Sequence, residues 1–194
     1  MVLQDAELVR RLTAEDESKR IIITPLIDPA KQIGPSSIDV SLGGNFKIPM
    51  TSQIAAIDPR KSELVQRYLR SVEVRLEEPF FLHPGEFVLA STLEFVRVPS
   101  DLACRIEGRS SWGRLGLLVH ATAGFVDPGY SGSLTFELFN AGKLPIELKP
   151  GMRMAQLCFF HLDGIPWRPY DKRPGSKYNN SLFAEGSRIW QDEV

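Results

Sequence analysis

The second half of the chain alternates short apolar runs with turn signals, and this rhythm is the strongest constraint on the fold. From Val72 onward, runs of five to eight residues are separated by Pro-Gly, Asn-Ala-Gly, Asp-Pro-Gly or Pro-Ser. Strands bounded by such turns at a spacing of about ten residues are typical of an all-β sandwich or barrel. The expected strands are VEVRL at 72–76, FVLAST at 87–92, EFVRVP at 94–99, LACRIEG at 102–108, GLLVHATA at 116–123, LTFELFN at 134–140, PIELKP at 145–150 and MAQLCFF at 154–160.

Two short helices are expected before this region, so the chain is interpreted as a helical cap on a β-body. Residues 5–12 have apolar side chains at helical spacing behind Asp5 as a candidate N-cap, and residues 62–70 repeat the pattern behind Ser62. We expect a single domain over residues 1–194. Its segment 168–194 loses the strand rhythm and is either a flexible terminus or a lid that orders over a ligand.

Composition excludes several classes of partner. A chain of 194 residues that is 43% hydrophobic can bury one core, and a net charge of -1 offers no basic field for a nucleic-acid polymer. The charged N-terminus lacks the apolar core of a signal peptide, and no apolar run approaches the roughly 18 residues of a membrane span. We therefore expect a cytoplasmic protein without membrane contact. Cys104 and Cys158 form no CxxC pair and are interpreted as reduced, buried thiols.

The segment 107–137 concentrates the polar side chains that could carry chemistry. Residues 108–114, GRSSWGR, offer backbone N–H groups at small residues, two hydroxyls and two guanidinium groups, which suit an oligophosphate. The alternative is a helix that begins at Ser110 or Ser111 with Arg109 and Arg114 at the surface. Residues 124–132 are interpreted as a hairpin in which Asp127 is either a turn residue or a ligand for a water or a sugar hydroxyl.

Glu137 is unusual because it interrupts an otherwise apolar strand. It shares a strand face with Thr135 and Phe139, whereas Phe136 and Leu138 point to the opposite face. This carboxylate either faces solvent or lines a pocket. In a pocket it is suited to carry protons near neutral pH.

Six blocks in this order resemble the dCTP deaminase family within the trimeric dUTPase superfamily. They are SSIDVSLG at 36–43, GRSSWGRLG at 108–116, TAGFVDPGYSG at 122–132, FELFN at 136–140, GMRMAQL at 151–157 and RPGSKY at 173–178. The resemblance spans nearly the whole chain. It implies a distorted β-barrel or jelly-roll of the dUTPase-like type, with a short N-terminal helix and a flexible C-terminal lid. It also implies a homotrimer with sites at the subunit interfaces.

The resemblance also implies a role for each site residue. Glu137 matches the catalytic glutamate, which takes a proton from water and delivers one to the amino group leaving C4 of cytosine. Ser110 and Arg114 match residues that position the water and steady developing charge. Asp127 matches the ligand of the deoxyribose 3′-hydroxyl, and Tyr130 an aromatic residue against the sugar. The remaining implied substrate-binding residues are Arg109, Ser111, Trp112 and Gly113 in the nucleotide-binding stretch, Thr135 and Phe136 in the strand, and Tyr170, Lys177 and Ser181 in the tail.

The tail contains the one departure from the family pattern. The family usually has Gln four residues after the tail Lys, and this chain has Ser181 there. Either the shorter hydroxyl replaces that contact through water, or the lid closes differently.

The sequence lacks the H-x-E and P-C-x-x-C pattern of zinc deaminases, so no zinc and no protein-bound metal are expected. The expected metal is Mg²⁺ carried by the triphosphate of dCTP. We predict deamination of dCTP to dUTP, with dTTP as a possible feedback inhibitor. A close alternative is the bifunctional enzyme that releases dUMP and diphosphate, because Ala123-Gly124-Phe125 resembles those members. A more distant alternative is a non-catalytic nucleotide-binding regulator.

Overall fold

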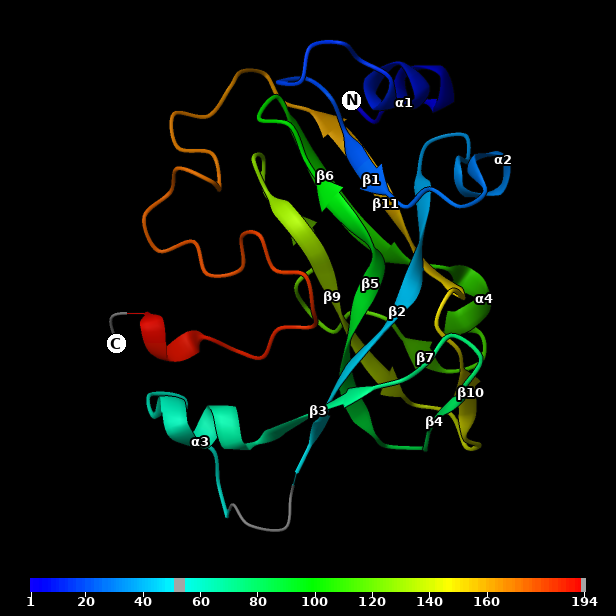
Figure 1. The fold of residues 1–194 in the computed structure, drawn as a ribbon, viewed down its shortest axis with the longest axis vertical. Coiled ribbons are helices and arrows are strands. Elements are labelled where there is room, and N and C mark those ends of the chain that lie inside the picture. The colour runs from blue at the N-terminus through cyan, green and yellow to red at the C-terminus, as the bar shows by residue number, and fades with distance from the viewer. Residues whose placement is uncertain (51–54, 193–194) are drawn as a thin grey trace.

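A curled nine-stranded sheet forms the body of the protein in a computed structural model that describes residues 1–50 and 55–192 (Figure 1). The strand order is β7–β9–β5–β2–β11–β6–β8, with β1 beside β5 and β3 beside β2; β4 and β10 form a separate pair. The strands are β1 (Ile22–Thr24), β2 (Ile38–Pro49), β3 (Leu69–Glu73), β4 (Phe80–Leu82), β5 (Phe87–Arg97), β6 (Leu102–Gly108), β7 (Leu117–Leu118), β8 (Phe125–Val126), β9 (Ser131–Asn140), β10 (Ile146–Leu148) and β11 (Arg153–His161). The helices are α1 (Asp5–Leu12), α2 (Pro29–Gln32), α3 (Ser62–Arg67), α4 (Ser110–Gly113) and the 3₁₀-helix η1 (Ile189–Gln191).

A short connection between β7 and β8 forces the sheet to curl. These two strands lie at opposite ends of the strand order, yet only residues 119–124, called here the 119–124 link, join them. Even fully extended, this link spans only about 20–25 Å, so the ends of the sheet must approach each other. Glu137 N donates to Val119 O (3.0 Å) and Ile106 N donates to Gly124 O (2.8 Å), which extends both pairings into the link. The predicted mainly β, distorted-barrel class is confirmed.

The two predicted helices form, with different ends from those expected. In α1 the capping residue is Gln4, whose side chain accepts from Ala6 N (2.9 Å), and Asp5 is the first helical residue. The second helix, α3, ends at Arg67 rather than residue 70, and its N-cap is Lys61 without a side-chain cap bond. Residues 69–73 instead pair with β2, and this tertiary pairing overrides the local helical pattern.

The strand prediction missed β2, the central strand of 12 residues. Its Gly43-Gly44 pair resembles a turn signal in sequence, but here the glycines allow close approach between strands. A Cβ at Gly43 would lie 2.9 Å from Thr92 O, and one at Gly44 would lie 2.5 Å from Val74 O.

Three other local predictions were wrong. The runs at 87–92 and 94–99 are one bulged strand, β5, whose pairing register with β9 shifts between Ser91 and Phe95. The run at 116–123 contributes only the two residues of β7. The segment 124–132 is not a hairpin, because β8 pairs with β6 while β9 pairs with β5.

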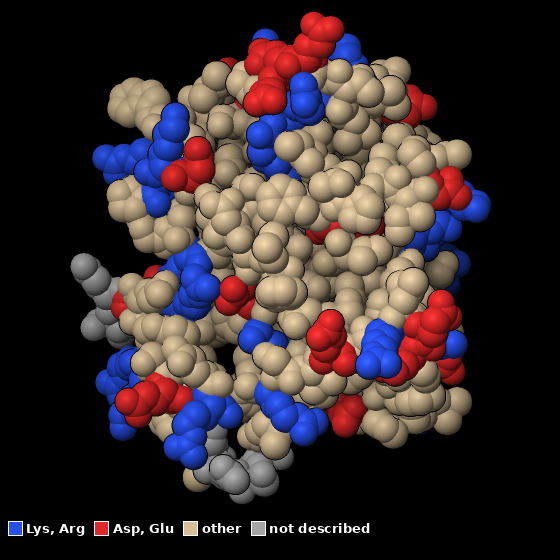
Figure 2. All heavy atoms as spheres, viewed as in Figure 1, with Lys and Arg blue, Asp and Glu red and all other residues tan. Residues whose placement is uncertain are grey.

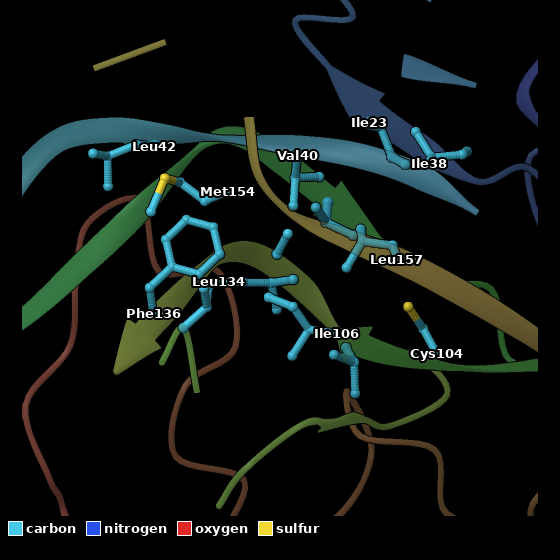
Figure 3. Close-up of a cluster of buried hydrophobic side chains, with 14 of the residues drawn as sticks. Ile23, Ile38, Val40, Leu42, Cys104, Ile106, Leu134, Phe136, Met154 and Leu157 are labelled. Carbon is cyan, nitrogen blue, oxygen red and sulfur yellow. The ribbon is translucent and has the colours of Figure 1, made fainter. Parts of the chain in front are cut away.

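The core lies inside the curl of the sheet and is built from alternate residues of facing strands (Figure 3). Phe136 is 0% exposed and packs there with neighbours that include Leu42, Ile106 and Met154. Full burial of a large apolar side chain contributes roughly 1.5–3 kcal/mol relative to exposure. Cys104 points into this core, and burial raises the pKa of its thiol. Across the described residues, none of the helices is long and apolar enough to span a membrane.

Candidate active site

A pocket of about 570 Å³ opens on the outer face of β9, between that strand, α3 and the C-terminal tail. Its volume lies within the range of small-molecule sites, roughly 300–1,000 Å³. In Figure 1 the tail, coloured orange to red, passes along β9 and brings η1 near α3. The predicted site residues that line the pocket are Asp127, Tyr130, Thr135, Glu137, Tyr170 and Ser181.

Glu137 faces this pocket because of the strand alternation seen in the sequence. Phe136 and Leu138 are buried, whereas Thr135, Glu137 and Phe139 lie on the partly exposed face. The Glu137 Oε2 atom accepts hydrogen bonds from Ala121 N (2.8 Å) and Thr122 N (3.2 Å) in the 119–124 link. No described residue donates to Oε1. The carboxylate is therefore anchored through one oxygen, and the other is available for a ligand or a water.

The turn from Asp127 to Tyr130 places a second carboxylate in the same pocket. Tyr130 N donates to Asp127 O (3.1 Å), and Gly129 adopts a φ of +82°, the left-handed conformation that glycine tolerates after Pro128. Tyr130 is 7% exposed, and its hydroxyl donates to Ser133 O (2.8 Å). Burial raises the pKa of this phenol, so it stays neutral. The ring of Tyr130 is thus a fixed apolar wall beside Asp127.

A glycine in a ligand-binding turn is expected to leave open space for the ligand, and Gly124 does not. It is buried, and a Cβ built on it would lie 3.1 Å from Ile106 O and 3.5 Å from His120 Nε2. The glycine therefore accommodates β6 rather than opening space in the pocket.

The C-terminal tail contacts the pocket through an aromatic pair and backbone hydrogen bonds. The ring of Tyr170 is tilted against Tyr130 with centroids 5.6 Å apart, and its hydroxyl accepts from Tyr178 N (3.1 Å). Lys177 Nζ forms an ion pair with Asp192 (2.6 Å) and does not line the pocket. The predicted lid segment thus lies over the predicted catalytic strand.

The nucleotide-binding stretch predicted at 109–114 lies elsewhere on the surface. Its residues 110–113 form α4, which begins after Arg109, and no side chain caps the helix. Arg109 Nε contacts Asp39 Oδ2 (3.3 Å), and Trp112 Nε1 donates to Arg153 O (2.8 Å), which fixes α4 against β2 and β11. None of residues 109–114 lines the pocket of Glu137; Trp112 and Arg114 line a separate, more open hollow beside residues 143–147. One chain therefore brings together only part of the predicted set, and Phe136 lies in the core.

Sequence reasoning missed several parts of the pocket. Ile57, Val65, Tyr68 and Leu69 form an apolar wall from the α3 region. The apolar side of the predicted helix was a signal for this wall, although nothing indicated what it faced. The bonds from Ala121 and Thr122 had no sequence signal, because any residue except proline supplies a backbone N–H.

Within one chain, the charged side chains that line the pocket are acidic. Its lining contains Asp127, Glu137 and Glu185 but no Lys or Arg from the described residues. On the face shown in Figure 2, basic and acidic side chains are interspersed around a broad uncharged region, without a large patch of one sign. Within residues 1–50 and 55–192, no three His, Cys, Asp or Glu side chains are grouped to hold a metal ion.

Comparison with known proteins identifies the family. A family model described as dCTP deaminase-like matches residues 2–162. The chain is 47% identical over 195 residues to a dCTP deaminase, dUMP-forming, of Mycobacterium avium, covering 100% of this chain and 98% of the relative. It is 45% identical over 192 residues to a dCTP deaminase of Natronomonas pharaonis, covering 99% and 96%. A solved 2′-deoxycytidine 5′-triphosphate deaminase from Agrobacterium tumefaciens superimposes with a TM-score of 0.62 at 25% identity, covering 81% of this chain and 46% of that one. The chain belongs to the dCTP deaminase-like family.

Proposed function

We propose that this protein is an enzyme that hydrolyses dCTP to dUTP and ammonia. The observation that carries the proposal is Glu137, a carboxylate held through Oε2 in a pocket of nucleotide size while Oε1 stays accessible to a ligand. The names of the relatives, which include dCTP deaminase and dCTP deaminase, dUMP-forming, support the same substrate.

In this mechanism Glu137 transfers protons and the protein binds no metal of its own. Oε1 takes a proton from water as the water oxygen bonds to C4 of cytosine, and the electron pair of the C4–N3 double bond moves to N3. Glu137 then delivers this proton to the amino group and the C4–N bond to that group breaks, so ammonia leaves. The C4–N3 double bond re-forms, and transfer of the hydroxyl proton to N3 gives the uracil base of dUTP. Fixing Oε2 with two backbone N–H groups keeps the carboxylate oriented through both transfers. Thr135 lines the pocket on the same strand face as Glu137, and we assign it to the reacting end of the base.

We infer that a second copy of the chain completes each site. The pocket lining contains no Lys or Arg from the described residues, so alone it offers no positive charge to bind a triphosphate. Arg109 and Arg114 could supply positive charge, and Ser110 the hydroxyl that the family resemblance assigns to catalysis. All three lie on a different part of the surface. Beside them lie the exposed apolar side chains of Leu115 and Leu144, as expected for a surface covered on assembly. A homotrimer, with α4 of one subunit against the Glu137 pocket of its neighbour, provides both halves.

The tail is proposed as the lid over the triphosphate. Tyr170 and Lys177 are its phosphate-binding residues, and the Asp192 carboxylate that now pairs with Lys177 is replaced by phosphate when Mg²⁺–dCTP binds. Since dCTP is a cytoplasmic metabolite, the reaction is assigned to the cytoplasm. dTTP, which shares the deoxyribose and triphosphate, is the proposed feedback inhibitor.

Further hydrolysis to dUMP and diphosphate remains the second candidate because Asp127 lines the same pocket as Glu137. Asp127 either holds the 3′-hydroxyl or orients a water toward the α-phosphate.

Chromatography of the products formed from dCTP with Mg²⁺, together with an ammonia assay, tests both functions. We expect ammonia in either case, and Asp127→Asn should suppress diphosphate more than ammonia if the enzyme is bifunctional. Complete turnover to dUTP that stays intact refutes the bifunctional reading, and no ammonia release refutes deamination. Gly124 is a poor probe, because a side chain there meets β6.

A further inference from the structure

One turn of the tail is tied to β9 through its backbone. Ser133 N donates to Ser181 O (2.7 Å), and Glu185 N donates to Thr135 Oγ1 (3.0 Å). Between these two contacts Ala184 is 1% exposed, and its N–H donates to Asn45 Oδ1 on β2 (3.1 Å). The turn at 181–185 therefore lies directly on the strand that carries Glu137.

The side chain of Glu185 holds this turn in shape. Its Oε1 accepts from the Ser181 hydroxyl (2.7 Å), and its Oε2 pairs with Arg188 Nη2 (3.2 Å). The guanidinium of Arg188 also lies 5.6 Å from the ring centre of Tyr178 and donates to Lys177 O. The carboxylate thus links Ser181, at the start of the turn, to Arg188 and through it to the segment that contains Lys177, while the backbone N–H of the same residue contacts Thr135.

These contacts give Ser181 a partner within the tail. Its hydroxyl is engaged by Glu185 at the position where the resemblance leads one to expect a longer glutamine side chain. The serine side chain is shorter than that of glutamine, and its hydrogen bond to Glu185, four residues later, closes the turn.

We propose that Glu185 is a positioning residue that latches the tail onto β9 and so holds the lid over the nucleotide pocket. The role of the tail as a lid rests on the proposed function, whereas the latch itself rests on the contacts above. Loss of the latch raises the population of open tail, and substrate then has to supply the ordering that Glu185 supplied.

Hydrogen exchange of the tail in the absence of nucleotide tests the latch without relying on activity. In Glu185→Ala, amides of residues 178–188 should exchange about tenfold faster, because a hydrogen bond and an ion pair to a charged group are lost. Glu185→Gln keeps an acceptor for Ser181 and should show a smaller increase. Glu15→Ala, which removes an exposed carboxylate after α1, is the matched control and should leave tail exchange unchanged.

Steady-state kinetics on the same variants then connect the latch to the site. We expect Glu185→Ala to raise KM for dCTP by about tenfold with a much smaller change in kcat, because chemistry at Glu137 is intact. Tail exchange in Glu185→Ala that equals the wild type overturns the latch. Faster tail exchange in an enzyme that releases no ammonia from dCTP supports the latch and refutes only the proposed function.

Discussion

The substitution Glu137→Gln isolates proton transfer from binding. Glutamine has nearly the same shape as glutamate, and its amide oxygen can still accept the hydrogen bonds from Ala121 N and Thr122 N. Its NH₂ group occupies the place of Oε1 and cannot accept a proton. The pocket should therefore keep its form while it loses its base.

The expected magnitudes separate the loss of catalysis from the smaller changes in stability and in affinity for dCTP. Two charge-assisted bonds become neutral ones, which lowers the free energy of unfolding by about 1–2 kcal/mol. Removing general acid–base catalysis costs about 10²–10⁴-fold in rate, or roughly 3–5 kcal/mol in the activation barrier. Affinity for dCTP should stay within about tenfold, because Asp127, Tyr130 and the tail are unchanged.

Ammonia release measures the rate, and isothermal titration with dCTP measures binding in the same preparation. Glu15→Gln is the control for loss of an exposed carboxylate and should behave as the wild type. Ammonia release by Glu137→Gln within tenfold of the wild-type rate would refute the assignment of Glu137 as the proton carrier.

Two further predictions concern assembly and pH. If Arg114 and Glu137 meet between subunits, mixed oligomers of two inactive variants should regain some intact sites. Refolding an equal mixture of Arg114→Ala and Glu137→Gln should restore roughly a quarter of the sites. Activity no higher than that of either variant alone would contradict a shared site. Burial raises the pKa of Glu94, which is 0% exposed and accepts from Ser41 N (2.8 Å). As pH rises from about 4.5, the unfolded chain loses this proton first, so the free energy of unfolding should fall until the pKa of the folded state is passed. Urea unfolding across this pH range measures the fall, and an unchanged slope in Glu94→Gln would exclude Glu94 as its source.

The sequence by itself determined the class of the fold and the orientation of the key strand. Turn signals at regular spacing predicted a β-body because strands must be short and bounded by residues that reverse the chain. Two-residue alternation in LTFELFN placed Phe136 and Glu137 on opposite faces, and the structure has them so. The ordered blocks carried the family resemblance, because residue identity at fixed spacing is what a sequence records directly.

Only the tertiary structure decided how these parts meet. The long strand β2 was hidden because Gly43 and Gly44 look like a turn until the neighbouring strands are in place. The anchoring of Glu137 by the 119–124 link depends on backbone N–H groups, which nearly every residue possesses and no sequence pattern marks. The contact of Glu185 with Thr135 spans 50 residues, and local propensity says nothing about pairs so far apart. The sequence specified the side chains, and the curl of the sheet with the return of the tail set the distances between them.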